Sequence, residues 1–242
     1  MIGAVYSELN KGLSLYQIFI ADIEQKKIQL DGKELQIYVH CSYQTVLTRF
    51  WSVKYFADQL RAAEKINAKG IVIHLPKNIE EMTDDTMKIV AKYLKLATPN
   101  SPIYYFEHIV GNLTKRDNFD KIIKDIQDLA EKVNKNAKVR GCIDTCHIYA
   151  SGVDIRDYYD IENVLVHLND SVHGFNSGLD RHATLGTNLF SSANLKKFIE
   201  NIKADNYVIE LKDAKSSFEF LKENEINSCY LFYVISRIFE ID

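Results

Sequence analysis

The sequence predicts an α/β fold in which eight strands alternate with helices and close into a parallel (β/α)8 barrel. Short runs of apolar, β-branched or aromatic residues recur eight times along the chain, as expected for buried strands. Amphipathic segments with apolar residues at helical spacing lie between most of these runs. No linker rich in Pro, Gly or Ser interrupts the 242 residues, and this length suits one domain. We therefore expect residues 1–242 to form a single barrel domain.

Eight strands and four helices can be placed along the chain from these patterns. The predicted strands are residues 2–6, 16–20, 36–40, 70–74, 102–107, 139–144, 163–169 and 206–210. The predicted helices are residues 45–68, 80–97, 117–135 and 192–204. The connections after the first two strands are short or loop-like, with DGKE before the third strand. We therefore expect a TIM barrel whose first two helices are shortened.

Residues 226–242 form a separate apolar tail, INSCYLFYVISRIF followed by three residues. The tail is too short to span a bilayer, so we expect a C-terminal helix packed on the barrel, with an interface role as the alternative. We expect neither a signal peptide nor a membrane-spanning segment, because the start MIGAVYSELNKG and the apolar runs do not have their patterns. We expect a cytoplasmic protein that makes no membrane contact, and a nuclear or viral context stays open. The scattered cysteines agree with a reducing compartment.

The composition is that of a soluble globular protein, with 46% hydrophobic and 26% charged residues. The formal net charge of −3 provides no general attraction for nucleic acid. A DNA partner would need basic residues gathered locally, because phosphate contacts dominate affinity. Composition alone leaves the function open.

Potential metal ligands stand at the ends of six consecutive predicted strands. Active sites of (β/α)8 barrels lie at the carboxyl ends of the strands, so these side chains should meet at one mouth. Three further candidates, His147, Asp180 and His182, follow on the loops. The candidates at the strand ends are His40, His74, Glu107, Asp144, His167 and Glu210.

These nine candidates comprise four carboxylates and five imidazoles. A single His or carboxylate in such a position is more often structural, but that explanation does not extend to nine together. Four carboxylates at one barrel end would repel one another without a counter-charge, and burying them unpaired costs still more. A His/Asp/Glu set of this kind suits zinc or a similar cation. The sequence therefore predicts a cluster of several metal ions.

Two long segments resemble a known family. GCIDTCHIYASGVDI (141–155) and VHLNDSVHGFNSGLDRHATLG (166–186) closely resemble the signature segments of the endonuclease IV family, the zinc-dependent apurinic/apyrimidinic endonucleases of DNA repair. Further landmarks follow in the same order: IGA at the start, HCSY at 40–43, IVIHLP at 71–76, Glu107, and VIEL around Glu210. The resemblance runs from residue 2 to about residue 212, nearly the whole predicted barrel.

The resemblance implies a catalytic domain with three zinc ions per chain, with Mn²⁺ as an alternative at one site. His40, His74 and Glu107 correspond to ligands of the first ion. Glu107 also corresponds to a bridge to the second ion, and the catalytic carboxylates are Glu107, Asp144 and Glu210. The second ion is assigned Glu107, Asp144, His167 and Glu210, and the third is assigned His147, Asp180 and His182.

The activity implied by the resemblance is base excision repair. A hydroxide between two zinc ions would attack the phosphodiester 5′ to an abasic site, leaving a 3′-hydroxyl and a 5′-deoxyribose phosphate. Trimming of blocked 3′ ends is expected as well. Three Zn²⁺ ions, four carboxylates and a bridging hydroxide carry one net positive charge, which suits a phosphodiester. The expected partner is double-stranded DNA with an abasic site, bound by a monomer.

Three residues are predicted to contact DNA. Tyr43 matches the inserted tyrosine of the family, and Gln44 stands where bacterial members carry an apolar wedge residue. Arg181, between two ligand candidates, is placed to contact a phosphate. The loop after the second strand reads ADIEQKK (21–27) and has no clear counterpart of the family's DNA-contacting loop. We also expect Asn169 and Asp170 to organise the surroundings of His167.

Two other functions can be weighed against a nuclease. A metal-dependent sugar isomerase or epimerase has the same barrel and similar strand-end ligands, but it needs only one or two metal ions and leaves the D-R-H element unexplained. A catalytically inactive DNA-binding relative is disfavoured because no expected ligand is missing. The number of bound zinc ions separates nuclease from isomerase.

Overall fold

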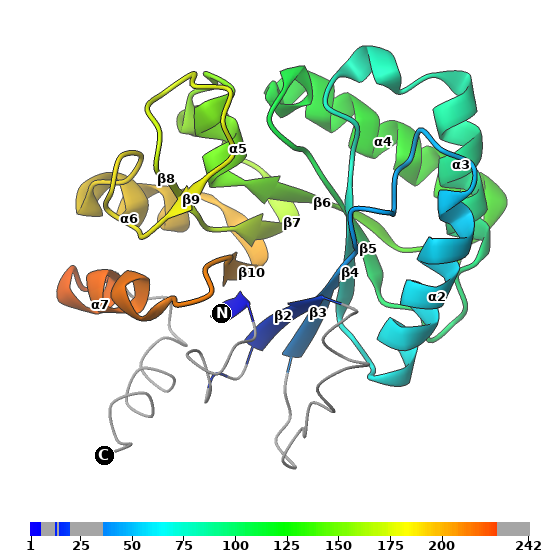
Figure 1. Cartoon of the computed structure of the whole chain (residues 1–242), viewed down its shortest axis with the longest axis horizontal. Coiled ribbons are helices and arrows are strands. Elements are labelled where there is room, and N and C mark those ends of the chain that lie inside the picture. The colour runs from blue at the N-terminus through cyan, green and yellow to red at the C-terminus, as the bar shows by residue number, and fades with distance from the viewer. Residues whose placement is uncertain (6–12, 14, 20–35, 227–242) are drawn as a thin grey trace. The chain divides into compact units, whose positions relative to one another are not determined.

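The fold is described by a computed structural model that covers residues 1–5, 13, 15–19 and 36–226 (Figure 1). Three predicted features lie outside these residues. They are the two shortened helices, the loop ADIEQKK and the C-terminal helix, of which only Ile226 is described.

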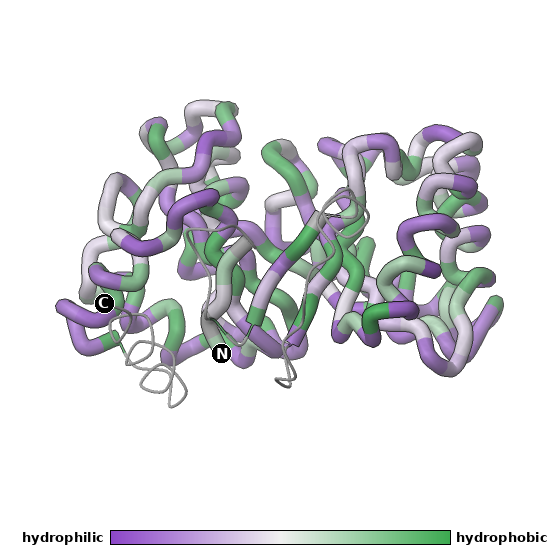
Figure 2. Tube along the Cα trace, turned by 60° about the horizontal axis from the view of Figure 1, so that its bottom comes forward, coloured by the Kyte–Doolittle hydropathy of each residue, from purple (hydrophilic) through white to green (hydrophobic). Residues whose placement is uncertain are grey.

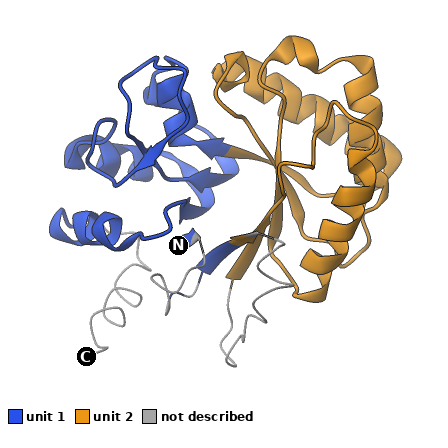
Figure 3. Ribbon diagram, viewed as in Figure 1, with its two compact units in different colours: residues 1–17, 33–35, 143–242 blue, residues 18–32, 36–142 orange. Residues whose placement is uncertain are grey.

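Eight parallel strands hydrogen-bond in the closed order β1-β10-β7-β6-β5-β4-β3-β2, so the predicted (β/α)8 barrel is confirmed. The strands are β1 (Ile2–Val5), β2 (Leu15–Phe19), β3 (Gln36–His40), β4 (Gly70–His74), β5 (Ile103–Glu107), β6 (Val139–Asp144), β7 (Glu162–His167) and β10 (Lys203–Ile209). The described chain divides into two compact units (Figure 3). Unit 1 holds residues 1–17 and 143–226 as far as they are described, and unit 2 holds residues 18–19 and 36–142.

Unit 2 contains neighbouring parallel strands and the helices that follow them. The helices are α2 (Ser52–Lys65), α3 (Asp84–Lys95) and α4 (Arg116–Val133), with short 3-10 turns η2 (Ile79–Glu81) and η3 (Asn112–Thr114). Each helix is amphipathic and buries one apolar face. The ring of Phe56 on α2 stacks on Tyr93 of α3 at 4.1 Å between centroids. The phenol of Tyr93 donates to Ser52 Oγ, which fixes the start of α2 against α3.

Unit 1 contains β7 and β10 with their own helices. Its elements are α5 (Thr145–Ala150), η4 (Ile155–Tyr158), a small antiparallel ladder of β8 (Asp170–Ser171) and β9 (His182–Ala183), α6 (Ser192–Asn201) and α7 (Lys215–Glu223). The ring of Phe198 on α6 packs against Phe190. The sequence patterns did not predict α5, α7 or the β8–β9 ladder, because each is short or irregular.

Some predicted boundaries were wrong for local reasons. The helix predicted from residue 45 begins at Ser52, because residues 42–51 form turns whose carbonyls accept from the Ser52 hydroxyl. Strand β7 ends at His167 and not at residue 169. Strand β10 ends at Ile209, and Glu210 then donates its backbone N–H to the side chain of Asn169. At this strand end, a hydrogen bond to a side chain thus takes the place of a hydrogen bond to the neighbouring strand.

Apolar and polar residues alternate along the helices, as the mixed green and purple of the tube in Figure 2 shows. This agrees with helices that are buried on one side and solvated on the other. Among the described residues, no helix has both the length and the apolar character needed to cross a bilayer.

Candidate metal centre

The unit 2 donor group consists of His40, His74 and Glu107, the last residues of β3, β4 and β5. These strands are neighbours, and His74 is paired with Glu107 in the ladder. Oε2 of Glu107 lies 3.2 Å from Nε2 of His40 and 3.3 Å from Nε2 of His74. Two imidazole nitrogens and one carboxylate oxygen thus converge, close enough together to hold one metal ion.

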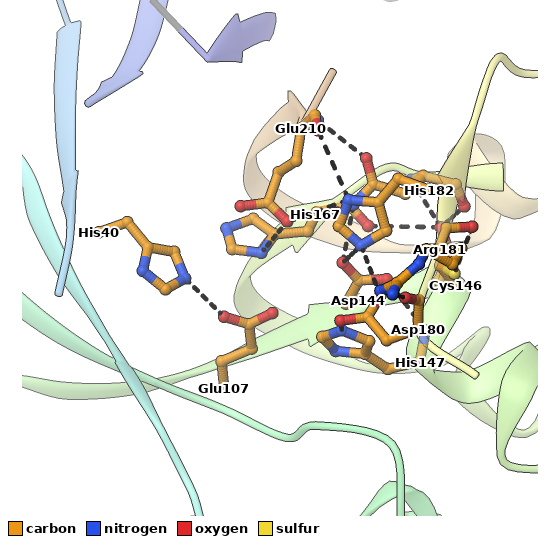
Figure 4. A network of polar contacts seen from close by, with 12 residues as sticks. His40, Glu107, Asp144, Cys146, His147, His167, Asp180, Arg181, His182 and Glu210 are labelled. Atoms are coloured by element: carbon orange, nitrogen blue, oxygen red, sulfur yellow. Dashed lines mark hydrogen bonds and ion pairs between the residues drawn. The ribbon is translucent and has the colours of Figure 1, made fainter. Parts of the chain in front are cut away.

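One backbone contact fixes the orientation of the His40 ring. Nδ1 of His40 lies 2.8 Å from the carbonyl of Cys41, which can only accept a hydrogen bond. Nδ1 therefore carries the proton, and Nε2 presents its lone pair toward Glu107, as a metal ligand must. Figure 4 shows the contact between His40 and Glu107. Because Glu107 is fully buried, its charge requires a counter-ion.

The first part of the unit 1 donor group is the pair His167 and Glu210. Nδ1 of His167 lies 3.2 Å from Oε2 of Glu210. The side chain of Gln17 on β2 contacts both residues: its Oε1 lies 2.8 Å from Nε2 of His167, and its amide N–H donates to Oε1 of Glu210 at 2.5 Å. Oε1 of Gln17 can only accept, so Nε2 of His167 carries the proton and Nδ1 faces Glu210.

The second part of the unit 1 donor group is Asp144, His147, Asp180 and His182 (Figure 4). Oδ1 of Asp144 accepts the backbone N–H of His147 and caps α5. Nε2 of His147 lies 3.2 Å from Oδ2 of Asp180. Nε2 of His182 lies 3.2 Å from Oδ1 of Asp180 and 3.4 Å from Oδ2 of Asp144, yet no partner is aligned for a hydrogen bond. A buried nitrogen between two carboxylates is the environment that a divalent cation fits.

Asn169 links the two parts of the unit 1 donor group. Its amide N–H group donates to Oδ2 of Asp144 at 2.7 Å and to Oε2 of Glu210 at 3.3 Å. Its Oδ1 accepts the backbone N–H of Glu210 at 2.8 Å. Asn169 was expected to organise the surroundings of His167, and it contacts Glu210, whose carboxylate faces His167. Asp170 has another role, because its buried carboxylate accepts backbone N–H groups from residues 186–190 and shapes that loop.

The charges of the unit 1 donor group displace two pKa values. Burial lowers the pKa of His182, but the carboxylates of Asp144 and Asp180 raise it more, to about 9. Burial raises the pKa of Asp180, but the close contacts with the imidazoles of His147 and His182 lower it more, so the net shift is downward. Protons on imidazole thus balance the carboxylates in the chain without metal. The donor set of imidazoles and carboxylates fits zinc, which would replace those protons.

Two cysteines lie beside the donor groups, within reach of some of their ligand atoms. Cys142 and Cys146 are both buried. Burial, and then the charge of Asp144, raises the pKa of Cys146 to about 12. Its thiol donates to the backbone carbonyl of Arg181 at 3.7 Å. A thiol that keeps its proton is a poor zinc ligand, and both side chains are fully buried in the protein interior.

The residues predicted to contact DNA are all exposed. The ring of Tyr43 is 85% exposed and lies 6.0 Å from the ring of His74 between centroids. Gln44 follows it on the same turn. The guanidinium of Arg181 donates to the backbone carbonyl of Asp180. Gln17 is the site residue that the sequence did not reveal, because it lies inside an apolar strand with no motif around it.

Residues 8–224 match the sequence model of the xylose isomerase-like TIM barrel family. The chain belongs to this family. Among curated relatives, a probable endonuclease 4 of Buchnera aphidicola is 30% identical over 62% of the chain, and apurinic-apyrimidinic endonuclease 1 of Plasmodium falciparum is 26% identical over 74%. The alignments span 53% of the Buchnera protein and 32% of the Plasmodium protein.

Solved structures of other proteins have the same fold. Endonuclease IV from Thermus thermophilus superposes with a TM-score of 0.66 and 21% identity, covering 93% of this chain and 99% of that one. A D-tagatose 3-epimerase-like protein superposes with a TM-score of 0.62 and 16% identity, covering 98% and 99%. These structural matches establish the barrel alone. The curated relatives confirm the resemblance to endonuclease IV predicted from residues 141–155 and 166–186.

Proposed function

We propose that this chain is a zinc-dependent endonuclease of DNA repair that hydrolyses the phosphodiester 5′ to an abasic site. The observation that carries the proposal is the presence of all nine predicted donor side chains in two convergent groups, one in each unit. The names of the curated relatives, endonuclease 4 and apurinic-apyrimidinic endonuclease 1, also support this proposal. Trimming of blocked 3′ ends is part of the proposal, because it breaks the same kind of bond.

The unit 2 donor group would bind one zinc ion through Nε2 of His40, Nε2 of His74 and a carboxylate oxygen of Glu107. The contact between His40 and the Cys41 carbonyl prepares the first of these nitrogens for coordination. The ring of Tyr43 stands beside this group. From that position it would pack into the gap left by the missing base and keep an abasic nucleotide out of the helix.

The unit 1 donor group would bind two more ions. His167 and Glu210, with Asp144, form the first set, and His147, Asp180 and His182 form the other. Gln17 and Asn169 hold the carboxylates and the His167 ring in the orientation that coordination requires. When bound, zinc supplies positive charge for the phosphoryl oxygens and makes a water molecule acidic near neutral pH.

The side chains contribute to hydrolysis through position and charge. Glu107, Asp144 and Glu210 are buried or nearly buried carboxylates that can accept a proton as water attacks phosphorus. The exposed Arg181 beside Asp180 can bind a backbone phosphate. An abasic nucleotide is selected because it has lost its stacking and pairing, so extruding it from the duplex costs less.

The function can be tested by incubating the protein with duplex DNA that carries one abasic analogue. We expect a single cut 5′ to the analogue that leaves a 3′-hydroxyl, which a polymerase can extend. Cutting should stop with chelator and return when zinc is restored. Equal cutting of the intact duplex, or none after zinc is restored, contradicts the proposal.

A sugar isomerase is the second candidate, because a D-tagatose 3-epimerase-like protein has the same fold. One or two metal ions are enough for such an enzyme. It would leave His147, Asp180 and His182 without a role. Interconversion of ketose sugars by the zinc-loaded protein, with no cutting of abasic DNA, would favour this candidate.

A further inference from the structure

Three aromatic side chains at the start of α2 in unit 2 are exposed to solvent. Phe50 is 63% exposed and Trp51 is 53% exposed, and Tyr55 follows one helical turn later with 41% of its surface exposed. The rings of Trp51 and Tyr55 meet edge to face, 5.6 Å apart between centroids. A cluster of large rings left in water indicates a surface that binds a partner.

One cation lies over a ring of this cluster, and two more are its neighbours in the sequence. Nζ of Lys92 on α3 lies 4.2 Å from the centre of the Phe50 ring. Arg49 and Lys54 are exposed neighbours in the sequence TRFWSVKY. Within residues 36–226, no carboxylate forms an ion pair with any of the three. The surface formed by Arg49, Phe50, Trp51, Lys54, Tyr55 and Lys92 is called the aromatic–basic patch below.

The aromatic–basic patch begins one residue beyond a pocket that the unit 2 donor group helps to line. A pocket of about 300 Å³ is lined by the ligand candidate His74, by Tyr43 and by Thr48, among others. Arg49 and Phe50 follow Thr48 directly in the chain. A strand of DNA held at the pocket could therefore extend onto the patch without leaving unit 2.

We propose that the aromatic–basic patch binds unpaired nucleotides of DNA. The rings of Phe50, Trp51 and Tyr55 offer flat faces and edges on which bases stack, and the three cations offer charge to the phosphates between those bases. Paired bases inside a duplex cannot reach such rings, so the chemistry selects a single strand. The choice of DNA over other polyanions rests on the proposed function.

A second copy of this chain fits the patch less well. In a symmetric dimer the same patch would face itself. Arg49, Lys54 and Lys92 would then lie opposite cations of the same sign, which disfavours association. A strand of nucleic acid brings the opposite charge.

Trp51 permits a direct test because it is the single tryptophan of the chain. The full zinc-loaded protein is titrated with a labelled, undamaged oligothymidylate of about 12 nucleotides, a site size usual for such surfaces. Its ordinary 3′-hydroxyl makes it a product and not a substrate of the proposed reaction. We expect saturable quenching of Trp51 emission together with a rise in the anisotropy of the oligonucleotide.

Variants separate stacking from charge. We expect Phe50→Ala and Tyr55→Ala each to weaken binding of the oligonucleotide about 10-fold. Lys92→Gln should weaken binding and reduce the dependence on salt by about one phosphate contact. Phe175→Ala is the matched control, because Phe175 is 54% exposed in unit 1 and outside the patch, and it should bind as the wild type does. Equal melting temperatures ensure that all four variants are folded.

Several results would overturn the inference. One is Trp51 emission that stays unchanged when the protein is saturated with the oligonucleotide. Another is an affinity for the oligonucleotide that is the same in the Phe50→Ala and Tyr55→Ala variants as in the wild type. A dimer in sedimentation that Trp51→Ala dissociates would assign the patch to a second copy instead. If the wild-type protein binds the oligonucleotide but does not cut abasic duplex, the proposed function is contradicted and the assignment of the patch remains. If it cuts abasic duplex but does not bind the oligonucleotide, the assignment of the patch is contradicted and the proposed function remains.

Discussion

The unit 2 donor group takes all three of its side chains from the last residues of neighbouring strands, whereas the unit 1 group also draws on a helix and a loop. Strand register alone brings His74 and Glu107 together. In unit 1, Asp180 comes from a loop with half of its side chain in solvent, and Asn169 connects carboxylates from different elements. The barrel strands alone thus position the unit 2 group. The unit 1 group also depends on the side chains of Gln17 and Asn169, which are called the supporting layer below.

The difference has an energetic cause. The unit 2 group contains one carboxylate beside two imidazoles, so little repulsion has to be offset. The unit 1 group contains three carboxylates, and like charges at such distances disfavour ionisation of all of them. The amides of Gln17 and Asn169 donate to two of these carboxylates and reduce this cost.

The largest loss of activity is expected on substitution of Glu107, which contacts both other members of the unit 2 group. Replacing Glu107 with Ala removes the oxygen that both His40 and His74 contact. We expect cutting of abasic duplex to fall by about 1000-fold, which corresponds to several kcal/mol of metal-derived stabilisation. Glu131→Ala, an exposed carboxylate on α4, is the control. Turnover near the wild-type rate would show that the unit 2 group does not take part in catalysis.

The supporting layer of unit 1 can be tested at Gln17. Replacing Gln17 with Leu removes the partner that orients His167 and the donor to Glu210. We expect zinc affinity, measured by competition with a chromophoric chelator, to fall roughly 10- to 100-fold. Gln59→Leu is the matched control, because that buried amide bonds Thr45 and Ser42 in unit 2. If both variants bind zinc as the wild type does, the supporting layer has no function in metal binding.

A smaller effect is expected at Tyr43, which contacts the substrate and not the metal in the proposal. Tyr43→Ala should reduce cutting of abasic duplex about 10-fold, the usual effect of one stacked ring. Hydrolysis of a small phosphodiester by the same variant should remain close to the wild-type rate. Equal losses on both substrates would exclude a role in opening the duplex.

The smallest effect concerns the stability of the chain without metal. The pKa of His182 is raised from 6.5 to about 9, so its contribution is complete below pH 6.5 and is lost as pH rises through 9. Asp180 has a lowered pKa, so its contribution is present above pH 3.8 and is lost only in stronger acid. The chelated protein should therefore melt several degrees lower at pH 9 than at pH 6.5.

Zinc should reverse this dependence, because it replaces the proton on His182. A His182→Gln variant should melt at nearly the same temperature at both pH values after chelation. An unchanged melting temperature of the chelated wild type between pH 6.5 and 9 would contradict the pairing of His182 with its carboxylates.

Sequence patterns predicted the barrel and the donor residues because each signal is local. An apolar run followed by His or Glu fixes both the strand and its last residue, as at His40, His74 and Glu107. Gln17 was missed because its partners His167 and Glu210 are distant in the sequence. The start of α2 was misplaced because apolar residues at helical spacing also occur in the turns of residues 45–51. Side-chain bonds of this kind leave no periodic signal.

Counting zinc by elemental analysis of the desalted full chain tests the central claim most directly. Three ions per chain are expected in the wild type, and two in a variant with Asp180→Ala, because this residue belongs to one proposed set alone. A single ion per chain, or the same count in wild type and variant, would contradict the binding of one zinc ion by the unit 2 donor group and two by the unit 1 donor group.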